Sequence, residues 1–226
     1  MTTTQSTTGT YDRDDDRARL LEAALDHVAF DGWSETALRA AATDTGIPIE
    51  QALNAFPGGA AELIAFHSET ADRRMLEALE LEPLSEMKVR EKAAKAIRLR
   101  LEANFRHREA IRTALTVLMM PQNAALSARL LYKTVDAIWY AIGDRSTDFN
   151  FYTKRGLLAG VYTTTLFYWL NDKSEGAAAT WTFLDRRIAE VMKVPQMLGK
   201  LTQFTGRLPL PRSPFRRAFR AAARGH

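Results

Sequence analysis

The architecture of this chain depends on residues 146–162, which read Ser146-Thr147-Asp148-Phe149-Asn150-Phe151-Tyr152-Thr153-Lys154-Arg155-Gly156-Leu157-Leu158-Ala159-Gly160-Val161-Tyr162. Ser146, Thr147 or Asp148 can cap free backbone N–H groups, so the pattern predicts that a helix begins here. No charged residue occurs from Gly156 to Leu170, which indicates a buried helix. That part would rise roughly 22 Å at about 1.5 Å per residue, short of a bilayer core of about 30 Å. We therefore expect the central helix of a soluble protein.

The first two turns of this helix carry a distinctive set of side chains. Asp148, Phe151, Tyr152 and Arg155 are spaced i, i+3, i+4 and i+7, which places them on one helix face. An acid, two aromatic rings and an arginine are typical of a protein-interface anchor. The alternative is that this face belongs to the core, because it continues into an apolar stripe formed by Leu158, Tyr162, Leu166 and Trp169.

Composition limits the classes of protein to consider. The chain has 226 residues and no cysteine, which excludes disulfides, thiolate metal sites and cysteine nucleophiles, and fits a reducing cytoplasm. Met1 to Thr10 is rich in Thr, Ser and Gln and has no apolar run. This pattern predicts neither a signal peptide nor a membrane anchor, and we expect residues 1–14 to be a disordered N-terminus.

Helical spacing of apolar residues continues along almost the whole chain, which predicts an all-α fold. Three helices at about 15–30, 37–42 and 48–55 are separated by glycine and proline signals, and they predict a helix-turn-helix subdomain over residues 15–59. Further helices are expected at about 60–81, 87–105, 123–142 and 177–192, within a second domain of residues 60–193. The basic run of the helix at 87–105 indicates a solvated face that contains Lys88, Arg90, Lys92, Lys95, Arg98 and Arg100.

The N-terminal part resembles the DNA-binding domain of TetR-type repressors. The similarity lies in residues 17–24, in Phe30-Asp31-Gly32-Trp33 and in Phe56-Pro57-Gly58-Gly59. The expected recognition helix, residues 47–56, nevertheless contains no Lys or Arg and carries Glu50. Phosphate contacts dominate DNA affinity and come mainly from basic groups, so this helix predicts no nucleic-acid partner. A ligand-responsive transcriptional regulator of the TetR type is kept as the alternative.

The C-terminal tail, residues 194–226, carries the excess of positive charge. It contains seven basic residues and no acid, so a net charge of +4 for the chain leaves −3 for residues 1–193. Its first part predicts an amphipathic helix whose apolar face is formed by Met197, Leu198, Leu201, Phe204 and Leu208. An apolar face with basic flanks is typical of docking on an anionic membrane surface. The alternatives are a terminal helix packed on the protein's own core and a loose solubilising tail.

No catalytic constellation is visible in the sequence. The nucleophile elbow GxSxG, the Walker loop and the dinucleotide motif GxGxxG do not occur, and His27, His67 and His107 are isolated from one another. The Glu-x-x-His pairs of di-iron bundles do not occur either. The sequence therefore predicts a protein that is not an enzyme and that has no metal site.

A second and more specific resemblance is to the coenzyme Q biosynthesis accessory family, the ninth Coq protein. It rests on Met119-Met120-Pro121-Gln122-Asn123, on residues 143–155 and on residues 180–187. The resemblance implies a TetR-like all-helical homodimer that does not act on DNA. It also implies a hydrophobic pocket for phospholipid and isoprenoid quinone intermediates, and a C-terminal amphipathic helix that meets the membrane. The implied partner is the di-iron hydroxylase of late ubiquinone biosynthesis.

The resemblance assigns roles to particular positions. The family's partner-binding surface corresponds to Asp148, Phe151, Tyr152 and Arg155, with Phe151 where a tryptophan is common in eukaryotic members. No cofactor is expected other than a bound lipid or isoprenoid quinone. The expected location is cytoplasmic and peripheral on the inner membrane, or on the matrix side in a mitochondrion. Periodicity suggests that the lipid pocket is lined by Leu115, Leu118, Met119, Ile138, Trp139, Leu158, Val161, Tyr162 and Leu166.

Overall fold

The fold is entirely helical throughout the part that the structure, a computed structural model, describes: residues 8–143 and 149–191. The expectation of an all-α fold is confirmed there, whereas the predicted amphipathic tail helix lies outside the described residues. The α-helices are α1 (Thr8–Asp31), α2 (Glu35–Thr45), α3 (Ile49–Ala55), α4 (Gly59–Glu80), α5 (Val89–Glu102), α6 (Arg108–Leu118), α7 (Ala124–Ala141), α8 (Phe149–Asn171) and α9 (Ala178–Val191). Short 3-10 turns occur at Leu84–Glu86, Phe105–His107, Pro121–Asn123 and Glu175–Ala177.

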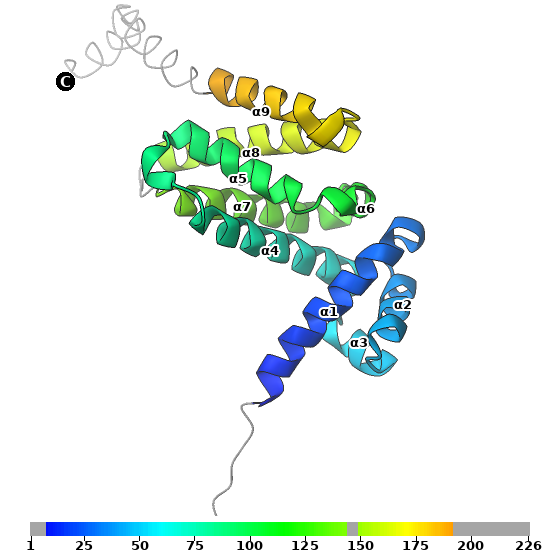
Figure 1. Cartoon of the computed structure of the whole chain (residues 1–226). Coiled ribbons are helices and arrows are strands. Elements are labelled where there is room, and N and C mark those ends of the chain that lie inside the picture. The colour runs from blue at the N-terminus through cyan, green and yellow to red at the C-terminus, as the bar shows by residue number, and fades with distance from the viewer. Residues whose placement is uncertain (1–7, 144–148, 192–226) are drawn as a thin grey trace, which may run out of the picture. The chain divides into compact units, whose positions relative to one another are not determined.

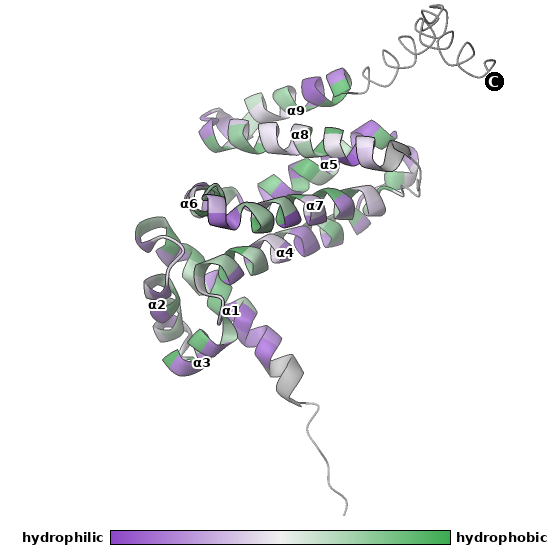
Figure 2. Cartoon of the chain, turned by 180° about the vertical axis from the view of Figure 1, so that it is seen from behind, coloured by the Kyte–Doolittle hydropathy of each residue, from purple (hydrophilic) through white to green (hydrophobic). Residues whose placement is uncertain are grey.

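Helix α1 begins earlier than its sequence predicts. It starts at Thr8, so residues 8–14 are helical and the expectation of a disordered segment up to residue 14 is corrected for them. One tertiary contact explains part of this extension, because the Arg13 guanidinium donates a hydrogen bond to the backbone oxygen of Asn54 at the end of α3. Arg13, Asp14 and Asp15 are exposed, and the coloured part of α1 nearest its N-terminus is largely hydrophilic in Figure 2.

Helices α2 and α3 form the expected helix-turn-helix with α1. Ser34 caps α2 by accepting a hydrogen bond from the backbone N–H of Ala37 at 3.2 Å, as the sequence predicts. Gly46 ends α2 with a φ of 69°, a left-handed conformation that glycine adopts without a Cβ penalty. Leu20, Ala24 and Phe56 of the subdomain are buried in an apolar core that continues into Leu63 of α4 and Ala114 of α6.

Helices α4 to α8, and α9 as far as Ile188, stack beside this subdomain in one compact unit (Figure 1). Helix α8 buries one face, on which Thr165 and Trp169 are completely buried. Its other face is exposed at Gly156, Gly160, Thr164, Phe167 and Tyr168, so the expectation of a buried helix is correct for one face only. Tyr168 of α8 stacks on Phe183 of α9 with ring centroids 4.5 Å apart, which joins the last two helices. The capping residues Ser146, Thr147 and Asp148 lie outside the described residues, and the described helix begins at Phe149.

Candidate functional site

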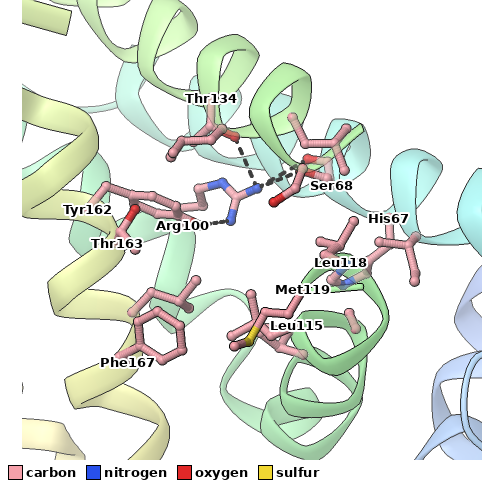
Figure 3. A pocket seen from close by; sticks show the side chains of 17 residues that line it. His67, Ser68, Arg100, Leu115, Leu118, Met119, Thr134, Tyr162, Thr163 and Phe167 are labelled. Atoms are coloured by element: carbon pink, nitrogen blue, oxygen red, sulfur yellow. Dashed lines mark hydrogen bonds between the residues drawn. The ribbon is translucent and has the colours of Figure 1, made fainter. Parts of the chain in front are cut away.

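A pocket of about 290 Å³ opens between helices α4 to α8. Because five helices contribute to it, segments from Ile64 to Phe167 meet around one space, as Figure 3 shows. The pocket is lined by Ile64, His67, Ser68, Arg100, Ile111, Ala114, Leu115, Leu118, Met119, Ser127, Leu130, Leu131, Thr134, Tyr162, Thr163, Leu166 and Phe167.

One side of the pocket is apolar and leads to the surface. Leu115 and Leu118 of α6 are half-buried, and Phe167 of α8 is partly exposed. Met119, at the end of α6, has 72% of its surface exposed and marks the mouth. These flexible and aliphatic side chains can contact an apolar ligand and adjust to its shape.

The opposite side is polar and is organised by Arg100, as Figure 3 shows. The Arg100 side chain donates from Nε to Asp72 Oδ1 at 2.7 Å and from Nη1 to the Tyr162 hydroxyl at 2.5 Å. Its Nη2 donates to Ser68 Oγ at 3.1 Å and lies 3.4 Å from Thr134 Oγ1. We refer to three lining residues, Arg100, Thr134 and Tyr162, together with Asp72, which binds Arg100 and Thr134 but does not itself line the pocket, as the polar floor.

The polar floor contains one charge of each sign. Thr134 Oγ1 donates to Asp72 Oδ1 at 2.9 Å, so the carboxylate of Asp72 is held by both Thr134 and Arg100. Burial disfavours the Arg100 guanidinium, but Tyr162 and Asp72 outweigh this effect and raise its pKa. Burial also raises the pKa of Tyr162, so its hydroxyl stays protonated at neutral pH. The floor is therefore a neutralised ion pair beside a phenol.

His67 borders the pocket as an uncharged ring. Burial and the nearby positive charge of Arg100 lower the pKa of His67 to about 3. Its Nε2 is 3.1 Å from Asn104 Oδ1, and a neutral imidazole in that position donates from Nε2. The ring also packs near the Trp33 indole, with centroids 5.5 Å apart.

The structure divides the residues that were expected to line a lipid pocket. Five of them do line the observed pocket: Leu115, Leu118, Met119, Tyr162 and Leu166. Four are buried elsewhere in the bundle: Ile138, Trp139, Leu158 and Val161. Helical periodicity identifies inward-facing positions, but it does not distinguish a wall from filled core.

Sequence reasoning missed the polar floor. Arg100 was assigned to a solvated basic face, which is wrong, because only 7% of this residue is exposed and it pairs with Asp72. A signal was present, since Arg100 follows Ala93 and Ile97 at helical spacing and so shares the apolar face of α5. An arginine on such a face requires a partner, because burying an unpaired charge is very unfavourable.

The predicted partner-binding face is only partly described. Asp148 and the Phe151 side chain lie outside what the structure describes. Tyr152 is 73% exposed on the first turn of α8. Arg155 is buried, and its guanidinium contacts Asp136 Oδ1 of α7 at 2.7 Å and 2.8 Å. Arg155 thus anchors this end of α8 to α7, and Tyr152 is the exposed one of the two members whose side chains the structure describes.

Neither a metal cluster nor a membrane-spanning helix occurs among the described residues. Within residues 8–143 and 149–191, no cluster of three or more His, Asp or Glu side chains could hold a metal ion. No helix in the same ranges is long and apolar enough to cross a membrane. The five apolar residues predicted to meet a membrane surface, Met197, Leu198, Leu201, Phe204 and Leu208, lie outside the described residues.

Sequence comparison finds one family that matches this chain. Residues 124–195 match the COQ9 family model. The chain is 34% identical over 183 residues to "Ubiquinone biosynthesis protein COQ9, mitochondrial" of Rattus norvegicus, covering 78% of this chain and 58% of that protein. It is 32% identical over 216 residues to the Drosophila melanogaster protein of the same name, covering 91% and 62%. The chain thus spans about three fifths of the length of these relatives.

Structural comparison shows the fold family. A solved TetR transcriptional regulator from Nitrosomonas europaea superimposes with a TM-score of 0.66 at 21% identity, covering 79% of this chain and 99% of that chain. This confirms the expected TetR-like fold. At such low identity the likeness concerns the fold alone.

Proposed function

Because this chain belongs to the COQ9 family, we propose that it is a non-catalytic accessory protein of ubiquinone biosynthesis that binds an isoprenoid quinone intermediate or a phospholipid. The observation that carries the proposal is the pocket with an apolar mouth at Met119 and Phe167 and a polar floor at Arg100 and Tyr162. Such a pocket matches an amphipathic ligand, which has one oxygen-bearing end and one hydrocarbon end.

The apolar wall supplies the driving force for binding in this proposal. Each methylene group that moves from water into contact with Leu115, Leu118 or Leu166 contributes about 0.8 kcal/mol. An isoprenoid chain is too apolar to cross water unaided, so a protein that shields part of it can move it between the bilayer and an enzyme. The pocket then serves as a carrier site.

Delivery requires a second surface, for which we propose the exposed start of α8. Tyr152 presents an aromatic ring there, and aromatic residues are frequent anchors of protein interfaces. The proposed partner is a ubiquinone-biosynthesis hydroxylase. A homodimer is also proposed, supported by the exposed α8 positions Gly156, Gly160 and Thr164, whose small side chains permit close approach of another helix.

The basic tail supports a proposal about location, at the surface of the inner membrane and on the matrix side in a mitochondrion. The relatives are named as mitochondrial proteins. The seven basic residues of positions 194–226 favour anionic phospholipids by electrostatic attraction. The full chain should float with vesicles that contain phosphatidylglycerol and stay behind with pure phosphatidylcholine vesicles. Equal flotation with both would contradict an electrostatic role of the tail.

The alternative of a DNA-binding regulator is disfavoured by the surface of α3. Glu50 is exposed at the start of this helix, and Gln51 donates to Asp16 Oδ2 at 2.5 Å rather than standing ready to read a base. A carboxylate on a groove-facing helix repels phosphate. A salt-dependent gel shift with DNA from the protein's own promoter region, altered by Glu50→Lys, would instead support the regulator.

The proposal is tested by the lipid content of the natively purified protein. Solvent extraction and mass spectrometry should find an isoprenoid quinone or phospholipid close to one molecule per chain. The Ser127→Trp substitution places an indole in the pocket and should remove most of this lipid. Ala128→Trp, at the exposed neighbouring position of α7, is the matched control and should retain it. A lipid content unaffected by Ser127→Trp would contradict the assignment of this pocket.

A further inference from the structure

We propose that the polar floor selects the head of the ligand: Tyr162 donates a hydrogen bond to an uncharged ring oxygen, and the Arg100–Asp72 pair excludes a ring that bears a carboxylate. The inference rests on the proposed function and names the chemical class and orientation of the ligand. An aromatic ring enters first, with its oxygen at the floor, and the isoprenoid chain leaves past Met119.

The donor is the Tyr162 hydroxyl. Its oxygen accepts from Arg100 Nη1 at 2.5 Å, and guanidinium nitrogens can only donate. The hydroxyl's own hydrogen atom has no acceptor among the described residues, so it is available to a molecule in the pocket. A buried donor left without an acceptor is unfavourable, and the end of a hydrocarbon chain offers none. A quinone carbonyl or a phenol oxygen supplies the acceptor.

The ion pair sets the charge that the floor accepts. Arg100 already faces the Asp72 carboxylate at 2.7 Å, so the pair has no net charge. A second carboxylate beside it would leave one buried negative charge without a counter-charge. His67 does not supply that counter-charge, since its low pKa keeps the ring neutral at physiological pH. The floor therefore favours a neutral phenol or quinone over a benzoic acid.

The volume of the pocket fixes how much of the ligand enters. At about 290 Å³ it lies at the lower end of the range of about 300–1,000 Å³ that is usual for ligand pockets. This space suits a substituted ring with a short piece of chain, not a long isoprenoid tail. The remainder of the tail passes the exposed Met119 and stays in contact with the surface or the bilayer.

The first test compares two probes by equilibrium dialysis: a benzoquinone with one isoprene unit, and prenylbenzene, which has the same ring and isoprene unit but no oxygen. Tyr162→Phe should lower the affinity for the quinone relative to that for prenylbenzene by about tenfold, the loss expected for one buried hydrogen bond. Tyr168→Phe on the same helix lies outside the pocket and should leave the ratio unchanged. An unchanged ratio in Tyr162→Phe would overturn the inference and leave the proposed function intact. Failure of the wild-type protein to bind either probe would overturn both.

The second test is a gain of binding, which misfolding does not produce. The probes are a prenylated benzoic acid and its primary amide, which differ in charge and little in shape. The wild-type protein should bind the acid at least tenfold more weakly than the amide. Asp72→Asn keeps an oxygen for Arg100 Nε but removes the negative charge. The affinity for the acid, relative to the affinity for the amide, should therefore rise by about tenfold or more. A ratio that does not change in a folded Asp72→Asn variant would overturn the role of the ion pair.

Discussion

Trp33 donates its indole N–H to the backbone oxygen of Ala110 at 2.7 Å, although the two residues are 77 positions apart in the chain. This hydrogen bond fastens the helix-turn-helix subdomain to the first turn of α6. The same helix supplies Leu115 and Leu118 to the pocket, and the Trp33 ring also packs near His67. The subdomain therefore supports the pocket wall, a role that needs no contact with DNA.

Replacing Trp33 by Phe should destabilise the whole fold. The substitution removes a buried hydrogen bond and part of a buried ring, and should lower the free energy of unfolding by roughly 1–3 kcal/mol in urea titrations. The control is Trp181→Phe, because Trp181 donates to the exposed oxygen of Gly176. The control should change the free energy of unfolding by less than about 1 kcal/mol. Equal effects of the two substitutions would show that the Trp33 hydrogen bond has no special importance.

Replacing Arg100 by Met should also be strongly destabilising. It leaves the buried Asp72 carboxylate without its counter-charge, and removal of one partner from a buried ion pair lowers the free energy of unfolding by about 3 kcal/mol. Arg98→Met on the same helix is the matched control, because Arg98 pairs with Glu102 near the surface. This substitution should change the free energy of unfolding by less than about 1 kcal/mol. Thermal or urea unfolding distinguishes the two. A mild effect at Arg100 would indicate that water enters the polar floor.

Stability should fall as the pH is lowered from about 6.5 toward 3. Burial lowers the pKa of His67 to about 3 in the folded protein, against 6.5 for an ordinary histidine. Between these two pH values His67 binds a proton in the unfolded chain but not in the folded protein. The free energy of unfolding should therefore decrease by up to about 1.4 kcal/mol per pH unit from this group. Urea titrations at several pH values measure the slope. His67→Gln keeps a donor for Asn104 without titrating, and a slope as steep in this variant would assign the effect to other groups.

Replacing Tyr152 by Ala should weaken binding of the hydroxylase and leave the fold intact. Tyr152 is largely exposed, so the free energy of unfolding should change by less than about 1 kcal/mol. Loss of an aromatic anchor from an interface typically weakens binding by about tenfold or more. Co-purification or surface plasmon resonance with the hydroxylase measures this loss. Tyr140→Ala, an equally exposed tyrosine on α7, is the control, and similar losses at both positions would argue against a specific anchor at Tyr152.

Local chemistry explains why much of the fold was predictable. Ser34 and Gly46 mark the ends of α2 through a side-chain hydrogen bond and a left-handed φ, and both effects depend on the residue type alone. The uncharged run from Gly156 to Leu170 predicted a long helix correctly, but only one face of that helix is buried. The start of α1 was misplaced because Arg13 is held by Asn54, a contact between positions 41 residues apart.

Residue types and their spacing were enough to predict the all-helical fold, the helix-turn-helix, the family and the acidic, cation-free surface of α3. The packed structure was needed to distinguish the inward-facing residues that line a pocket from those that fill the core. It also showed Arg100 buried against Asp72 and Tyr162, and Arg155 held by Asp136. The physical reason is that these arrangements depend on side chains from different helices meeting in space. Helical periodicity gives the direction of a side chain but does not name its partner.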